Sequence, residues 1–281
     1  MPATDLLTPT VTVAHRARPG HASQDRHLIL PNAVAVLDGA TNPDQPPGRD
    51  GGWYAGQLAL AIASRITDHA RDLTSVAEAG IAEVTREHQL VPGDSPSSTL
   101  TLLRWSDAAH PLEGFVLADT VLVVRLHDGT VLTRCDDRID RFSADLQAGY
   151  RARLAAGSGY DTEHRRLMDQ LRDHQAKGRN QPGGFWVAEA QPYAAHEALT
   201  VAINPGDVRD AAILSDGASA AVDVYGRFPN WTTALDVMGE RGPGAVIGAV
   251  RAVEADDAQA RRWPRAKVHD DATAVYLRFQ P

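Results

Sequence analysis

Three apolar segments that lie far apart in this sequence each adjoin an aspartate. The pairs are Val34–Leu37 with Asp38, Ala211–Leu214 with Asp216, and Ala272–Val275 with Asp270. A buried strand that ends in a carboxylate directs that charge out of the edge of its sheet. Several such ends that converged would form a concentrated negative site, which is unstable unless cations occupy it. The chain must therefore either keep these ends apart as simple turns or bring them together around cations.

The order of the apolar segments predicts an α+β fold with sheets built mainly from hairpins. The regular alternation of strand and helix that is typical of a doubly wound parallel sheet does not occur in this sequence. Pro31-Asn32 and Asp128-Gly129 each separate two apolar runs by a short turn, which indicates a hairpin. The strands that we expect are 11–14, 27–30, 33–37, 98–105, 115–117, 121–126, 131–134, 185–188, 198–203, 211–214 and 272–279.

Other segments carry apolar residues at helical spacing. Leu58, Ala61, Ile62 and Ile66 recur at intervals of three and four residues, which predicts a helix over 53–70. Four further helices are expected at 75–88, 218–224, 232–239 and 244–256. Because the sequence contains no internal repeat and no convincing linker, we expect one domain over residues 1–281, with a charged helical region at 136–184.

Charge and composition exclude several classes of function. The formal net charge of −8 argues against a nucleic-acid partner, which requires concentrated Lys and Arg. No apolar run approaches the roughly 20 residues that span a bilayer, and Asp5 stands where a signal peptide carries basic residues. The single cysteine, Cys135, can form no internal disulfide, which fits a reducing compartment. We therefore expect a cytoplasmic protein that binds neither nucleic acid nor membranes.

Several catalytic patterns are missing from the sequence. Cys135 has no evident base partner, no Gly-x-Ser-x-Gly elbow occurs, and no His-Glu-x-x-His zinc pattern occurs among the 11 histidines. Carboxylates alone, by contrast, suit hard cations such as Mg²⁺ or Mn²⁺. A glycine follows both Asp38 and Asp216, and a residue without Cβ lets the backbone approach a ligand closely.

Six motifs, in chain order, resemble those of the type 2C metal-dependent protein phosphatases, and the resemblance runs from about residue 11 to residue 279. The motifs are Ser23-Gln24-Asp25, Leu37-Asp38-Gly39, Ser97-Ser98-Thr99, Leu117-Ala118-Asp119-Thr120, Pro205-Gly206-Asp207 with Leu214-Ser215-Asp216-Gly217, and Asp270-Asp271-Ala272-Thr273. This resemblance implies a four-layer αββα sandwich, in which two antiparallel β-sheets are flanked by helices. It also implies two Mn²⁺ or Mg²⁺ ions, with room for a third. In relatives the region equivalent to 136–184 carries a flap near the active site, and the alternative for its charged runs here is a solvated helix face.

The resemblance assigns a role to each matched residue. Asp38 would bridge both metal ions, and the carbonyl of Gly39 would bind one of them. Asp216 and Asp270 would be direct ligands. Two further carboxylates complete the set implied by the family. Asp25 would support the second metal, mostly through water, and Asp119 would bind a third, weaker ion.

The sequence departs from the family pattern at several points. Ala40 follows Asp38-Gly39 where many relatives carry a longer turn or a histidine, so the group that protonates the leaving alcohol is unassigned. Relatives carry a phosphate-binding arginine shortly before the first acidic motif. Three basic residues in that stretch, Arg16, Arg18 and His21, are candidates for this role, and we rank Arg18 first. Ala118 replaces the usual glycine beside Asp119, which is expected to narrow the position of a third ion.

The function that the resemblance implies is hydrolysis of phosphoserine or phosphothreonine in proteins. Hydroxide formed from water between two Mn²⁺ or Mg²⁺ ions that share Asp38 would attack phosphorus in line. Two alternatives stay open. One keeps the chemistry but takes a small phosphorylated metabolite as substrate. The other is a pseudophosphatase that acts as a binding or regulatory module, against which stands the retention of Asp38, Asp216 and Asp270.

Overall fold

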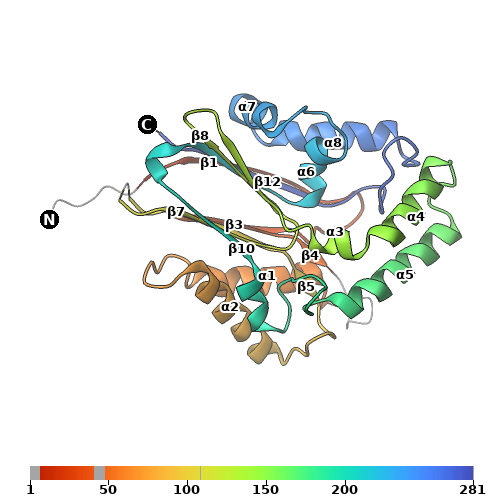
Figure 1. Cartoon of the computed structure of the whole chain (residues 1–281), viewed down its shortest axis with the longest axis horizontal. Helices are drawn as coiled ribbons and strands as arrows, with labels where there is room; N and C mark the ends of the chain where they lie inside the picture. The colour runs from red at the N-terminus through yellow and green to blue at the C-terminus, as the bar shows by residue number, and fades with distance from the viewer. Residues whose placement is uncertain (1–6, 41–47, 108, 281) are drawn as a thin grey trace.

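The structure is a computed structural model that describes residues 7–40, 48–107 and 109–280. Two antiparallel β-sheets lie face to face, and helices cover the outer face of each (Figure 1). The expected α+β, four-layer αββα sandwich is confirmed. The start of β1 (Thr10–Arg16) and the end of β12 (Ala272–Arg278) lie at the end of the sheets that is opposite the helices α4 (Ala144–Ala155) and α5 (Thr162–Gly178) (Figure 1).

Each main sheet has five strands. The first sheet has the order β1 (Thr10–Arg16), β12 (Ala272–Arg278), β11 (Val208–Leu214), β8 (Val121–Leu126) and β9 (Val131–Arg134). The second has the order β10 (Leu199–Ile203), β7 (Leu112–Leu117), β6 (Leu100–Arg104), β3 (Ala33–Leu37) and β2 (Arg26–Leu30). A short pair, β4 (Gly39–Ala40) with β5 (Ser97–Ser98), continues beyond β3. The predicted turns at Pro31-Asn32 and Asp128-Gly129 join β2 to β3 and β8 to β9.

The central strands are buried on both faces, which explains their unbroken apolar sequence. In β3, the side chains of Ala35 and Leu37 face helices, whereas those of Val34 and Val36 face the other sheet. This alternation follows from the two-residue period of a strand. Three apolar clusters result, one between the sheets and one between each sheet and its helices.

Two helices cover the second sheet and three cover the first. The second sheet is covered by α1 (Gly51–Ala63) and α2 (Leu73–His88), with the 3₁₀ turn η1 (Pro192–Glu197) packed against α2. Asp50 and Asp72 cap α1 and α2 by accepting backbone hydrogen bonds at 2.8 and 2.7 Å. The first sheet is covered by α6 (Asp216–Asp223), α7 (Trp231–Arg241) and α8 (Gly244–Asp256). A second 3₁₀ turn, η2 (Pro205–Asp207), precedes β11.

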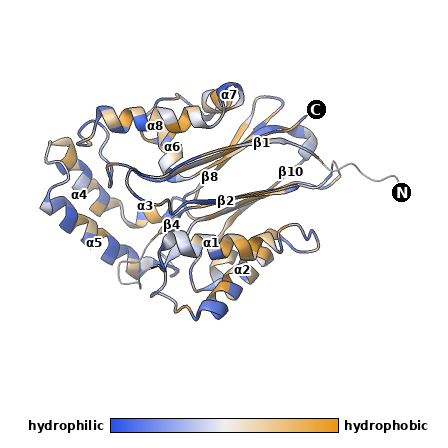
Figure 2. Ribbon diagram, turned by 180° about the vertical axis from the view of Figure 1, so that it is seen from behind, coloured by the Kyte–Doolittle hydropathy of each residue, from blue (hydrophilic) through white to orange (hydrophobic). Residues whose placement is uncertain are grey.

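Three helices lie within residues 136–184 and extend beyond one end of the sheets (Figure 1). They are α3 (Arg138–Phe142), α4 (Ala144–Ala155) and α5 (Thr162–Gly178). The hairpin of α4 and α5 is largely hydrophilic (Figure 2), with a small core of its own. That core contains Tyr150, Leu154 and Leu171 together with Ala260 from the loop between α8 and β12. The hairpin is therefore attached to the loop that leads to Asp270.

Two sequence-based expectations are wrong. The segment Phe185–Ala188 is not a strand, because it makes only single bridges, from Phe185 to Arg179 and from Ala188 to Ser98. Its apolar side chains are buried under other parts of the chain, and a short apolar run has the same appearance in either case. The helix expected over 53–70 ends at Ala63, although Ile66 beyond it is fully buried.

Candidate functional site

The ends of β3, β11 and β12 gather at one edge of the two sheets. Asp216 follows β11 and Asp270 precedes β12, and these strands are neighbours in the first sheet. The backbone N–H of Ser215 donates to the carbonyl of Thr273 at 3.0 Å, which ties the two strand ends together. A Cβ on Gly217 would collide with the carbonyl oxygen of Asp271, so this contact requires glycine.

Asp25 links the second sheet to the first. It lies just before β2 and is almost fully buried. Its Oδ2 accepts hydrogen bonds from Ser215 Oγ at 2.9 Å and from Thr273 Oγ1 at 2.7 Å. Its Oδ1 has no hydrogen-bond partner within the described residues. Burial raises the pKa of Asp25 to about 6, although the bonds from Thr273 and Ser215 oppose the rise.

The backbone of Asp38 is held from two sides by the Ser-Ser-Thr motif. Thr99 Oγ1 accepts from the Asp38 N–H at 2.9 Å, and the Thr99 N–H and Ser98 Oγ donate to the Asp38 carbonyl at 2.9 and 3.0 Å. Thr99 Oγ1 also lies 2.6 Å from Thr120 Oγ1, which joins this motif to the one that contains Asp119. A Cβ on Gly39 would collide with the carbonyl of Gly51. The position of Asp38 is thus fixed by neighbours rather than by its own side chain.

The carboxyl group of Asp38 lies in the field of other acids. Burial raises its pKa well above the ordinary value, and negative charge on Asp25, Asp216 and Asp270 raises it further. Asp25 and Asp38 can share a hydrogen bond only when one of them carries a proton, because ionised carboxylates are acceptors only. The four acids are therefore electrostatic neighbours, with more negative charge than their surroundings stabilise.

The side chain of Lys267 donates hydrogen bonds directly to one of these acids, Asp270. Its Nζ donates to Asp270 Oδ1 at 2.8 Å and to Oδ2 at 2.7 Å. Burial disfavours the ammonium charge, yet the carboxylates of Asp270, Asp216 and Asp38 raise the pKa of this lysine above its ordinary value. Burial and Asp216 raise the pKa of Asp270 to about 6, while Lys267 opposes that rise. The sequence analysis missed Lys267.

Asp119 lies within electrostatic range of Asp216 and lines the same cavity. Burial raises its pKa to about 7, and the charge of Asp216 adds to the effect. The preceding Ala118 has a φ of 72°, in the left-handed region that favours glycine. Ala118 therefore adopts the backbone conformation that the usual glycine of the related motif would adopt without strain.

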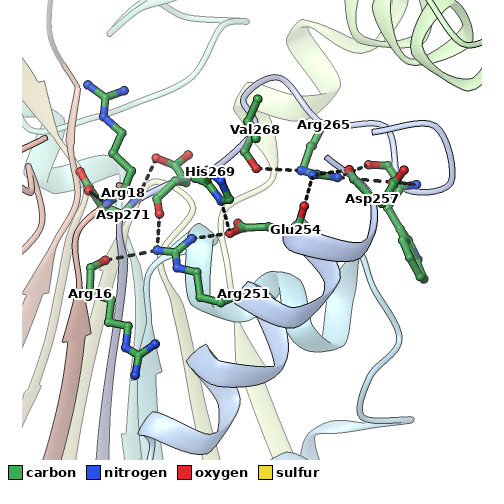
Figure 3. Close-up of polar contacts among 11 residues, drawn as sticks. Arg16, Arg18, Arg251, Glu254, Asp257, Arg265, Val268, His269 and Asp271 are labelled. Atoms are coloured by element: carbon green, nitrogen blue, oxygen red, sulfur yellow. Dashed lines mark hydrogen bonds and ion pairs between the residues drawn. The ribbon is translucent and has the colours of Figure 1, made fainter. Parts of the chain in front are cut away.

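Of the three basic candidates for phosphate binding, Arg16 is the last residue of β1, and Arg18 and His21 lie on the loop that follows it. The backbone N–H of Arg18 donates to Asp271 Oδ1 at 2.8 Å, and Asp271 Oδ2 accepts from the Gln24 N–H at 2.8 Å. The side chain of Arg18 extends away from Asp271 (Figure 3), and its buried Nε has no partner among the described residues. Arg16 contributes its carbonyl oxygen to Arg251. No hydrogen bond of His21 beyond a backbone turn to Arg18 is found within the described residues.

Two arginines hold the loop between α8 and β12 in place (Figure 3). Arg265 donates to the carbonyls of Val268 at 3.1 Å and Asp257 at 2.7 Å. Arg251 donates to the carbonyl of Asp270 at 2.5 Å and forms an ion pair with Glu254 at 2.7 Å. Both arginines escaped the sequence analysis, because a basic residue in a helix or charged loop resembles an ordinary surface residue.

Glu254 also contacts His269, the residue that precedes Asp270. His269 Nδ1 lies 2.7 Å from Glu254 Oε2, and Glu254 is almost fully buried. The imidazole therefore points toward α8 (Figure 3), where it completes the network that orients the loop.

A cavity of about 560 Å³ adjoins the acids. Its floor includes Asp119, Asp216, Asp270 and Lys267. The opposite wall comes from the α4–α5 hairpin and includes Tyr150, Arg151, Met168, Leu171 and Arg172. Asp25, Asp38 and Arg18 are not part of the lining of this cavity.

Two negative findings apply to residues 7–40, 48–107 and 109–280. In these ranges, no group of three or more His, Cys, Asp or Glu side chains stands ready to hold a metal ion. No helix in the same ranges is long and apolar enough to cross a membrane.

Comparison with known proteins gives matches among solved structures only. No family model and no curated protein matches the sequence. The catalytic domain of the serine/threonine protein phosphatase PstP in complex with two manganese ions aligns over 99% of this chain and 100% of its own, at 15% identity and a TM-score of 0.55. The PPM Ser-Thr phosphatase MsPP from Mycobacterium smegmatis, in complex with cacodylate, aligns over 96% and 98%, at 17% identity and a TM-score of 0.55.

A third structure comes from a different kind of organism. Serine-threonine phosphatase 2C from Toxoplasma gondii aligns over 98% of both chains, at 15% identity and a TM-score of 0.50. At this level of identity the comparisons show a shared fold, the one that the motifs imply.

Proposed function

We propose that this chain hydrolyses phosphomonoesters, with phosphoserine and phosphothreonine in proteins as substrates and with two Mn²⁺ or Mg²⁺ ions as cofactors. The observation that carries the proposal is that Asp38, Asp216 and Asp270, from three distant segments, lie within range of one another's charge, with Asp216 and Asp270 in the lining of a cavity. The shared fold supports it, since the solved structures with this fold include serine/threonine phosphatases and one of them holds two manganese ions.

The donor set fits hard divalent cations in its chemistry. Asp25 Oδ1 is buried without a hydrogen-bond partner in the described part of the chain. Burial raises the pKa of Asp38, and its acidic neighbours raise it further. This rise indicates uncompensated negative charge around Asp38, which a bound cation would stabilise. Oxygen ligands of this kind suit Mn²⁺ and Mg²⁺. In this proposal Asp38 would serve both ions, the Gly39 carbonyl would bind one of them, and Asp216 and Asp270 would be direct ligands.

The remaining acids take outer positions in this proposal. Asp25 supports the second ion, and its bonds from Ser215 and Thr273 keep its carboxylate directed into the site. Asp119 is the ligand of a third, weaker ion. Such ions, when bound, would lower the pKa of a bound water, so that hydroxide is available at neutral pH to attack phosphorus, and would neutralise charge on the phosphoryl oxygens.

Arg18 is the proposed phosphate-binding residue. Its backbone is anchored by Asp271, next to Asp270, while its side chain extends away from Asp271 and its buried Nε has no partner among the described residues (Figure 3). A planar guanidinium binds two phosphoryl oxygens at once. We also place the protein in the cytoplasm, because its single cysteine needs no oxidising compartment.

A small phosphorylated metabolite is a second candidate substrate. The cavity of about 560 Å³ is within the size range of small-molecule sites, and both Tyr150 and Met168 offer apolar surface in it. A phosphopeptide would instead need an open approach past the α4–α5 hairpin.

A phosphatase panel tests the proposal. Phosphopeptides and phosphometabolites are incubated with the protein in Mn²⁺, in Mg²⁺ and in a chelator. We expect Asp38→Asn to lower Mn²⁺-dependent hydrolysis at least about a hundredfold, because the shared ligand is lost. Asp173→Asn, a change on the exposed side of α5, should keep full activity. Near-native activity of the Asp38 variant, or hydrolysis that persists in chelator, would contradict the assignment.

A further inference from the structure

Lys267 is chemically unusual in this chain. The sequence contains 28 Lys and Arg residues, and only Lys177 and Lys267 among them are lysines. An ammonium group is a compact point charge, whereas a guanidinium is a broad planar fork. Of the two cation types, the lysine therefore resembles a metal ion more closely in size and in charge density.

The ammonium of Lys267 occupies oxygens that a metal would need. It binds both oxygens of Asp270, at 2.8 and 2.7 Å. Its charge also interacts with Asp216 and Asp38, the other two proposed ligands of the first ion. The side chain is 55% exposed, so its stem reaches the acids across the surface of the site rather than from a closed pocket.

The loop that carries Lys267 is fixed on both sides of it. Arg265, two residues before Lys267, donates to the carbonyl of Val268, one residue after it. Arg251 donates to the carbonyl of Asp270 (Figure 3). These bonds hold the backbone, while the flexible four-carbon stem leaves the ammonium able to move.

We propose that Lys267 is a tethered counter-ion of the acid group, with which a divalent cation must compete for Asp270. The inference rests on the proposed function, since it concerns the same metal centre. In the metal-free protein the ammonium stabilises the carboxylates of Asp270, Asp216 and Asp38. A divalent ion that binds there displaces it, and the affinity of the site for the ion is reduced by the free energy of the bonds that break.

Displacement also gives Lys267 a second position. Lys267 lines the same cavity as Asp216 and Asp270. Once released from Asp270, its ammonium remains beside the metal-bound acids, at the wall of the cavity into which a phosphoryl group would project.

Calorimetric titration with Mn²⁺ tests this competition without reference to activity. We compare the wild type with Lys267→Met, which keeps the stem and removes the charge, and with Lys267→Arg, which keeps the charge. Lys177→Met is the matched control, because Lys177 is exposed near the end of α5 and is the only other lysine. We expect Lys267→Met to bind Mn²⁺ at least about tenfold more tightly, while the Arg variant and the control stay within about threefold of wild type.

Thermal unfolding supplies an independent readout. In chelator, Lys267→Met should melt about 2–4 °C below wild type, because its acids lack a counter-ion, and saturating Mn²⁺ should remove the difference.

The outcomes separate this inference from the proposed function. If wild type and Lys267→Met bind Mn²⁺ with the same affinity, the counter-ion role is wrong and the metal centre stands. If neither protein binds Mn²⁺, both the counter-ion role and the proposed metal centre are wrong.

Discussion

Replacing Thr273 by Val perturbs the link between Asp25 and the first sheet at a single atom. Thr273 is fully buried, and its Oγ1 donates to Asp25 Oδ2 at 2.7 Å. The same oxygen lies 2.9 Å from His15 Nδ1, whose ring can then donate to it. Valine has nearly the same shape as threonine, so the change removes a hydroxyl without opening a cavity. His15 is exposed and can turn to water, whereas Asp25 cannot.

The expected loss of stability depends on the charge of Asp25. In the metal-free protein at pH 8, above the Asp25 pKa of about 6, the lost bond is to an ionised group and is worth about 1.5–3 kcal/mol. At pH 5 most of the carboxyl carries a proton, and a neutral bond is worth about 0.5–1.5 kcal/mol. The free energy of unfolding should therefore fall by about 1 kcal/mol more at pH 8 than at pH 5.

The sign of this pH effect follows from proton uptake. The folded-state pKa of Asp25 is raised above its unfolded value, so folding takes up a proton between about pH 4 and 6, and stability falls as pH rises through that window. The Thr273 bond lowers this pKa, so its removal raises the pKa further and extends the fall to higher pH. A difference of 1 kcal/mol corresponds to about 0.7 of a pKa unit.

Urea unfolding in chelator at pH 5 and pH 8 measures the effect. Thr273→Ser is the control, since it keeps the hydroxyl and loses only a methyl group, and its cost of about 1 kcal/mol should be the same at both pH values. Equal losses for Thr273→Val at pH 5 and pH 8 would refute the idea that this hydroxyl stabilises an ionised Asp25.

Two other changes test how the fold holds the site. Gly217→Ala should lower the free energy of unfolding by about 1–3 kcal/mol and weaken Mn²⁺ binding, because the added Cβ meets the Asp271 carbonyl. Gly248→Ala is the control, since Gly248 faces open space on α8 and the change should be neutral or stabilising. Equal effects of the two changes on urea unfolding would contradict this expectation. Arg125→Met should cost about 3–5 kcal/mol in the same assay, because the buried carboxylate of Asp210 loses the partner that pairs with both of its oxygens, and adding Asp210→Leu should restore most of the loss.

The sequence predicts the layers of the fold well where a strand is buried on both faces. Val34–Leu37 and Ala211–Leu214 are apolar without interruption because in each strand one set of side chains faces helices and the other faces the opposite sheet. Phe185–Ala188 has the same appearance but is buried by side chains rather than paired in a sheet. Burial alone produces both patterns, so local sequence cannot separate them.

The acids of the site could be found in the sequence, whereas their supporting residues could not. Asp38 and Asp216 stand out because each follows an apolar strand and precedes a glycine that the structure requires. Arg251 and Lys267 act through contacts with the Asp270 region that depend on how a loop folds back onto the strand ends. Such contacts leave no periodic or spacing signal in the sequence.

The proposed metal centre can be located in a crystal grown with Mn²⁺, from data collected at a wavelength where manganese scatters anomalously. We expect anomalous peaks among Asp38, Asp216 and Asp270, with the ammonium of Lys267 moved away from Asp270. Manganese bound elsewhere on the surface, with Lys267 still paired to Asp270 and no peak among the three aspartates, would contradict the proposal.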